Sequence, residues 1–224
     1  MRLAQRRKYQ TGFLFDAIED VTGMENMMAA SQLSELLLQS LEHEKGGVMV
    51  YEAALTCVVN TDLRKEWEKY LEQTRKHERV LTAVCEELGL DPNQDTPGRQ
   101  VVRHLGSALV QAMELARGAG NPNAAELVAC ECVVLAETKD HLDWQLIGKC
   151  AENFKGAAAD VLKNAYDEVE DQEDEHLYHS KGWCRELWIG SLGMKAVLPP
   201  PEEVKDVKTA IGAAKAEQAS EQAR

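Results

Sequence analysis

Glu173 and His176 lie three residues apart and form the pair whose types and spacing most directly indicate chemistry. Three residues of an α-helix turn by about 300°, so both side chains lie on one face of a helix. A carboxylate oxygen and an imidazole nitrogen are both common ligands of divalent metal ions. The spacing therefore predicts that one helix supplies two ligands to one metal ion, provided that other helices supply the rest.

The composition favours an all-α protein. Of the 224 residues, 44% are hydrophobic but only 5% are aromatic, and frequent Ala, Leu, Glu, Lys and Gln are typical of helices rather than sheets. Apolar residues recur at helical spacing in five segments. We expect long helices at about 31–60, 62–88, 123–151 and 155–188, and an additional helix at about 99–117.

These helices belong to one domain at 31–197. Residues 1–30 are an N-terminal extension with an apolar stripe that includes Phe13 and Phe15, and Gly23 favours a helix end there. The extension is either a docking segment or a loose end. Residues 198–224 begin with a run of prolines and have little apolar face, so a mostly disordered tail is expected.

Charge and cysteine usage limit the possible functions. The net charge of −13 argues against binding to nucleic acids or to anionic membranes. It suits cation binding, although ordinary helical proteins are also acidic. The six cysteines form no Cys-x-x-Cys pair, which favours reduced thiols. Without a long apolar run or a secretory signal, the expected location is the cytoplasm.

The two halves of the chain repeat one pattern. Glu44 and Glu137, on the first and third long helices, each precede a large aromatic residue by seven positions, which places both on one helix face. His77 and His176, on the second and fourth, each follow an acid-Gln-x-x-x sequence. Helix pairs related in this way can direct their ligands to one central cavity.

This order of motifs resembles the ferritin-like superfamily of di-iron carboxylate proteins, which includes rubrerythrins and bacterioferritins. In that superfamily Glu-x6-Tyr and Glu-x-x-His patterns recur on paired helices. The resemblance covers about 31–188, and the segment 71–81 is most similar to bacterial stress-associated ferritin-like proteins. It implies a ferritin-like four-helix bundle, with an additional helix between its second and third helices.

Carried over residue by residue, the resemblance implies a metal site with five ligands: Glu44, His77, Glu137, Glu173 and His176. Thr74 stands where the pattern has a glutamate, so the site is either asymmetric, limited to one ion, or completed by another residue. Gln73 lies one turn before His77 and is a candidate, although the matching Gln172 suggests a structural role for both glutamines.

Two further histidines are candidate ligands by their spacing. His141 follows Glu137 by four residues, and His179 follows His176 by three. Each shares a helix face with a predicted ligand, so each can ligate the metal or support a ligand from behind. A solvated or core histidine is the alternative for both.

The resemblance implies two iron ions or one, with manganese as the alternative, because both metals accept carboxylate and imidazole ligands. The implied chemistry is Fe(II) oxidation by dioxygen or reduction of hydrogen peroxide, as in a ferroxidase-like enzyme, with an external electron donor. We also expect a homo-oligomer, most simply a dimer. The alternative is a metal-free helical scaffold or stress-response interaction protein of the same fold, which Thr74 favours.

Overall fold

A computed structural model describes residues 23–224, with side-chain environments from residue 28 onward. Within this range the chain forms helices and connecting segments without any strand. The prediction of an all-α protein is therefore confirmed. The long helices are α2 (Gly23–Cys57), α3 (Thr61–Glu87), α5 (Pro122–Asn153) and α6 (Ala157–Ser191). No helix in the described range is both long enough and apolar enough to span a membrane.

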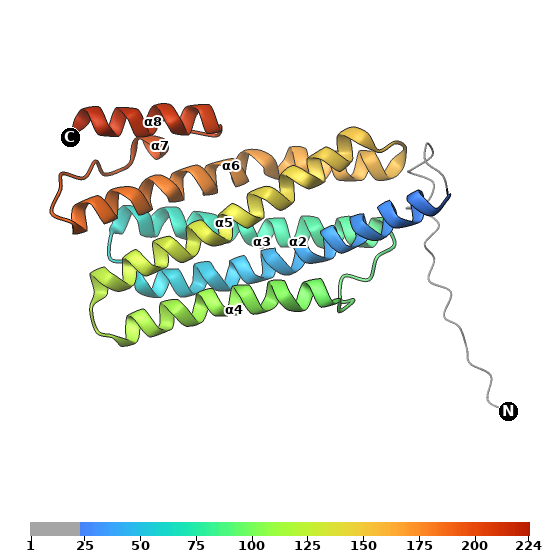
Figure 1. The fold of residues 1–224 in the computed structure, drawn as a ribbon, viewed down its shortest axis with the longest axis horizontal. Helices are drawn as coiled ribbons and strands as arrows, with labels where there is room; N and C mark the ends of the chain where they lie inside the picture. Colours follow the sequence, from blue (N-terminus) through green and yellow to red (C-terminus); the bar gives the residue numbers. More distant parts are fainter. Residues whose placement is uncertain (1–22) are drawn as a thin grey trace.

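The remaining helices lie on the outside of the long ones (Figure 1). Helix α4 (Pro97–Gly118) occupies the connection between α3 and α5, as predicted, and packs against α2 and α5. The short helices α7 (Pro201–Val204) and α8 (Ala210–Ala223) follow α6 and pack against it.

The N-terminal boundary differs from the sequence prediction. Helix α2 begins at Gly23, so Gly23 starts a helix instead of ending one, and Ser31 lies inside α2. Ala30 and Leu33 are both buried, because the apolar stripe of α2 extends beyond the predicted start and packs against the other helices. Phe13 and Phe15 lie outside the described residues.

Polar side chains cap the first turns of several helices. The Asn60 side chain accepts hydrogen bonds from the backbone N–H groups of Asp62 and Leu63 and so caps α3. Thr96 caps α4 and Asn121 caps α5 in the same way. Each cap satisfies backbone donors that have no partner within the helix.

The adjacent glycines in α2 allow two neighbouring helices to come close. A Cβ atom on Gly106 of α4 would lie 3.4 Å from the Cα of Gly46, and a Cβ atom on Gly47 would lie 3.1 Å from the Thr74 methyl group of α3. A methyl group at Gly106 would make ordinary van der Waals contact with α2, whereas one at Gly47 would require the Thr74 side chain to shift slightly. Each glycine within a helix lowers stability by about 1 kcal/mol relative to alanine. The close approach of α4 and α3 to α2 explains why Gly46 and Gly47 are present despite this cost.

The apolar core is divided into two clusters by a layer of buried polar residues. On all four long helices, one cluster lies on one side of this layer and the second lies on the other. The first cluster includes Leu37, Leu41, Leu81, Val84, Trp144, Leu162 and Val169. The second includes Tyr51, Ala54, Leu63, Trp67, Tyr70, Val133 and Trp183. The polar layer thus lies in the middle of the structure, far from the helix ends.

The C-terminal segment is ordered, in contrast to the disordered tail that its composition suggested. Glu186 of α6 is fully buried and accepts hydrogen bonds from the backbone N–H of Val197, the Ser220 hydroxyl and Arg224. Val207 and Ala216 are also buried. Glu202 is buried as well and accepts two hydrogen bonds from Arg185 of α6, and Glu203 accepts one from Trp183. The polar composition was misleading, because buried carboxylates hold this segment together with few apolar side chains.

We predict that Glu186→Ala releases the C-terminal segment. Removing one partner of a buried charge network leaves the others unpaired, so the free energy of unfolding should fall by about 3 kcal/mol. Chemical denaturation measures this loss, and trypsin should cleave more quickly after Lys205 and Lys208. Glu217→Ala, an exposed change on α8, is the control. Equal stability and equal cleavage of the two variants would contradict the prediction.

Candidate metal centre

Six buried side chains from four helices converge in the polar layer. We call them the central cluster: Glu44 of α2, His77 of α3, Glu137 and Asp140 of α5, and Glu173 and His176 of α6. Each is at most 4% exposed. On each long helix these positions lie between residues of the first apolar cluster and residues of the second, so the six side chains form one layer.

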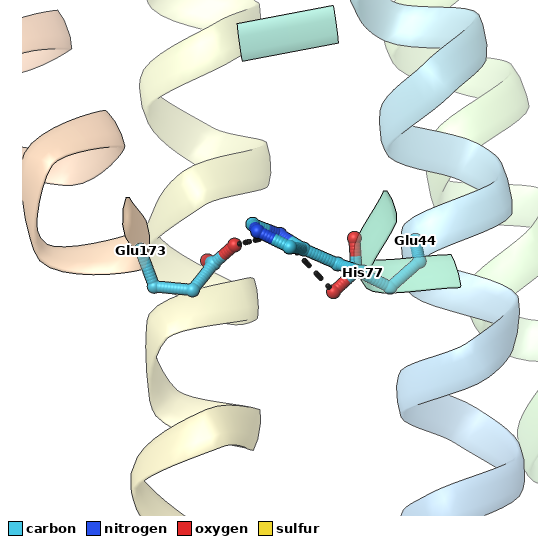
Figure 2. Close-up of side chains that lie close together, drawn as sticks. All are labelled: Glu44, His77 and Glu173. Atoms are coloured by element: carbon cyan, nitrogen blue, oxygen red, sulfur yellow. Dashed lines mark ion pairs between the residues drawn. The ribbon is translucent and has the colours of Figure 1, made fainter. Parts of the chain in front are cut away.

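One half of the central cluster joins α2, α3 and α6. The His77 Nδ1 atom lies 2.7 Å from a Glu173 carboxylate oxygen and 3.9 Å from a Glu44 oxygen. Figure 2 shows the His77 ring between the two carboxylates, which approach it from opposite sides. One ligand-type atom from each of these residues lies within 4.8 Å of the others, so the three can hold one ion.

The other half joins α5 and α6. The His176 Nδ1 atom lies 3.5 Å from a Glu137 oxygen and 3.8 Å from a Glu173 oxygen. Glu137, Glu173 and His176 form a second group that can hold an ion. Because Glu173 belongs to both groups, the two candidate positions are adjacent.

Two glutamines orient the histidines. Gln172 accepts a hydrogen bond from His77 Nε2 at 2.8 Å, and Gln73 accepts one from His176 Nε2 at 2.9 Å, with the ring protons assigned from this network. A proton on Nε2 leaves the lone pair of a neutral ring on Nδ1, and Nδ1 faces the carboxylates. The glutamines thus present both histidines as ligands.

Two aromatic residues hold the outer carboxylates. The Tyr51 hydroxyl of α2 donates a hydrogen bond to Glu137 of α5 at 2.7 Å, and the Trp144 indole of α5 donates one to Glu44 of α2 at 2.8 Å. Each aromatic therefore supports the glutamate of the opposite helix, and not the one that precedes it by seven residues. Both rings are also buried and exclude water from the cluster.

Many polar atoms of the central cluster have no hydrogen-bond partner. These are Glu44 Oε2, His77 Nδ1, Glu137 Oε2, Asp140 Oδ1, both Glu173 carboxylate oxygens and His176 Nδ1. The short His77–Glu173 contact is close without being a hydrogen bond. Buried polar atoms without partners are costly. Their type and arrangement fit bound cations, because the atoms of Glu44, His77 and Glu173 and those of Glu137, Glu173 and His176 lie close enough to hold an ion.

Burial and mutual repulsion alter the protonation of the carboxylates. Burial raises the pKa of Glu173 to about 8, and the nearby Glu137 charge adds to the rise. Burial and the Glu173 charge also raise the pKa of Glu44 and of Asp140 well above their ordinary values. Three acids therefore tend to hold protons when no cation is bound.

The remaining groups are ready to bind a cation at neutral pH. Burial acts to raise the pKa of Glu137, but the close approach of His176 and the hydrogen bond from the Tyr51 hydroxyl outweigh it and lower that pKa. Burial lowers the pKa of His77 to about 4, so its ring is neutral at pH 7. Glu137 supplies a negative charge and His77 a free lone pair.

The structure brings the five principal predicted residues together and places the three less certain ones elsewhere. Gln73 lies behind His176 and does not face the cluster. His141 is on the outer side of α5, 3.2 Å from Asp174. His179 accepts or donates a hydrogen bond with Tyr70 and lies with Glu66 and Glu175 in a separate group. Helical spacing alone did not separate these residues from the ligand face, because neighbouring helices determine which part of the face is central.

Thr74, the departure from the family pattern, does not take part in the cluster. Its hydroxyl donates a hydrogen bond to the Tyr70 carbonyl oxygen at 2.9 Å, within α3 itself. Its methyl group packs near Gly47 of α2. Thr74 therefore serves helix packing, and the carboxylate missing from α3 is not replaced at that position.

Asp140 is the cluster residue that the sequence interpretation missed. It is buried, its Oδ1 atom has no hydrogen-bond partner, and it feels the charges of Glu173, Glu44 and Glu137. Its spacing of three residues from Glu137 was the available signal. The fourth carboxylate thus comes from α5 instead of α3.

No protein-family model, curated protein or solved structure matches this chain.

We predict that the metal-free protein loses stability as the pH rises from 6.5 to 8. Glu173 titrates near 8 in the folded state but near 4.3 when unfolded, so the folded state binds more protons in between. The low pKa of His77 has the opposite effect only below about 6.5. The free energy of unfolding should fall by up to about 1.4 kcal/mol per pH unit for each such proton.

Urea denaturation at several pH values measures this slope. Glu173→Gln should flatten it, because an amide cannot lose the proton, whereas Glu168→Gln, an exposed change on α6, should leave it unaltered. A wild-type profile that is level or rising between pH 6.5 and 8 would show that these acids are ionised without a cation.

Proposed function

We propose that the central cluster is a carboxylate–histidine metal site in a ferritin-like four-helix bundle. The observation that carries this proposal is the set of unpartnered buried atoms on four carboxylates and two histidines. Among the described residues, the ion pairs of Glu44, Glu137 and Glu173 join them only to His77 and His176. Four buried acids without a lysine or arginine partner must either hold protons or be compensated by a bound cation.

Iron is the metal that we propose, with manganese as the alternative. Carboxylate oxygens and imidazole nitrogens suit both ions, whereas a zinc or copper(I) site would favour thiolates or more histidines. Iron or manganese would supply exchange of electrons with dioxygen or hydrogen peroxide. The ligands divide into Glu44 with His77 and Glu137 with His176, and Glu173 is common to both. This division supports two ions more readily than one.

The protein's own residues would keep the site in place and dry. Gln73 and Gln172 fix the histidine rings, and Tyr51 and Trp144 fix the outer glutamates. The protons that Glu173, Glu44 and Asp140 hold would leave as cations bind. Ordered ligands on rigid helices reduce the reorganisation that a change in metal charge requires.

The first test is anaerobic titration of the metal-free protein with Fe(II), and separately with Mn(II), followed by metal analysis. Wild type should retain at least about one ion per chain. Glu173→Gln and His176→Ala should each weaken binding by more than about 100-fold, because each removes a ligand, and Asp140→Asn should weaken it less. Glu168→Gln is the matched control. Equally negligible metal in wild type and variants would leave a metal-free helical scaffold as the function.

The second test concerns turnover. When the Fe(II)-loaded protein is exposed to air or to hydrogen peroxide, the ultraviolet absorbance of Fe(III) should rise faster than for Fe(II) in the same buffer. Glu173→Gln should remove most of this acceleration. Wild-type oxidation at the rate of free Fe(II), despite stoichiometric binding, would indicate metal storage or a structural ion and not an oxidase or peroxidase.

A further inference from the structure

A polar cavity lies between α5 and α6 beside the central cluster. Its volume is about 260 Å³, and Glu173 is the one member of the central cluster that lines it. Glu173 is 1% exposed, and both its carboxylate oxygens lack hydrogen-bond partners. Glu173 thus belongs both to the lining of the cavity and to the central cluster, which links the cavity to a group of residues suited to a cation.

The outer wall of the cavity carries further carboxylate and imidazole groups of the kinds that bind metal ions. His141 Nδ1 lies 3.2 Å from an Asp174 oxygen, and Glu170 lies close enough to raise the pKa of Asp174 further, after burial. Their side chains are accessible, with Asp174 19% and His141 14% exposed. No lysine or arginine is among the residues that line the cavity. The field at its mouth therefore attracts cations and repels anions.

The size of the cavity suits a hydrated ion. Six water molecules occupy about 180 Å³ in the liquid, which is less than the cavity volume of about 260 Å³. The C-terminal segment supplies the last part of the wall, because Thr209 and Ala210 at the start of α8 line the cavity. Larger ligands would meet this segment and the rings of Tyr166 and Tyr178.

We propose that this cavity is the entrance through which a hydrated divalent cation reaches the central cluster, with Asp174 and His141 as its first contacts and Glu170 adding negative charge. This inference rests on the proposed function. A cation held by Asp174 and His141 would lie in the same cavity that Glu173 lines. Glu173 is shared by both halves of the central cluster, so an ion that enters there can pass to either.

The test measures the rate and the extent of Co(II) uptake by the full-length, metal-free protein, using the visible absorbance of bound Co(II) in a stopped-flow instrument. Ala210→Trp should narrow the entrance and slow uptake about fivefold or more, with the amount bound at equilibrium unchanged. Ala214→Trp places the same side chain at another exposed position of α8 and should not slow uptake. Circular dichroism checks that both variants are folded.

A second pair of variants tests the charge. The double variant Glu170→Gln, Asp174→Asn should slow uptake about tenfold at low salt and make the rate less dependent on ionic strength. Asp167→Asn, an exposed change on α6 outside the cavity, is its control.

The outcomes separate the two proposals. If wild type binds Co(II) and all variants take it up at the same rate, the entrance lies elsewhere and this inference is overturned, while the metal site stands. If wild type binds no Co(II), Fe(II) or Mn(II), the proposed function fails and the entrance fails with it.

Discussion

Four carboxylates and two imidazoles are removed from water in the middle of the structure, and the cost of this desolvation constrains what surrounds them. Protonation relieves part of that cost, as the raised pKa values of Glu44, Asp140 and Glu173 show. Hydrogen bonds from Tyr51 and Trp144 relieve another part. The lone pairs that remain converge on one another, which a folded protein tolerates when a cation completes the set. The apolar clusters on either side hold the helices in register and separate the polar layer from water at the ends of the bundle.

The two halves of the protein support one another through this layer. Each histidine is oriented by a glutamine from the other half, and each outer glutamate is held by an aromatic residue from the opposite helix. Neither half can therefore form its ligand geometry alone. The two halves of the protein do not contribute equally to the cluster. The Thr74 hydroxyl of α3 bonds to the backbone, whereas Asp140 of α5 adds a fourth carboxylate.

The C-terminal segment connects stability with access to the site. Buried Glu186 holds this segment against α6 through hydrogen bonds from Val197, Ser220 and Arg224. The same folding back brings Thr209 and Ala210 to the wall of the cavity beside Glu173. A segment outside the long helices thus shapes the cavity that we propose as the entrance to the central cluster.

The sequence by itself determined the helices and the principal residues of the cluster. Apolar periodicity located the long helices and α4. The resemblance of the repeated motifs to ferritin-like proteins predicted Glu44, His77, Glu137, Glu173 and His176 as one group, and intervals of three and seven residues return to one helix face. Only the tertiary structure separated His141 and His179 from that set and added Asp140, since the packing of neighbouring helices decides which side of a face points inward. It also ordered the C-terminal segment, because Glu186 is distant in sequence from its donors Ser220 and Arg224. Local composition reports only the propensity of a segment to form a helix. A buried carboxylate whose hydrogen-bond donors lie more than 30 residues away along the chain can be recognised only in the folded protein.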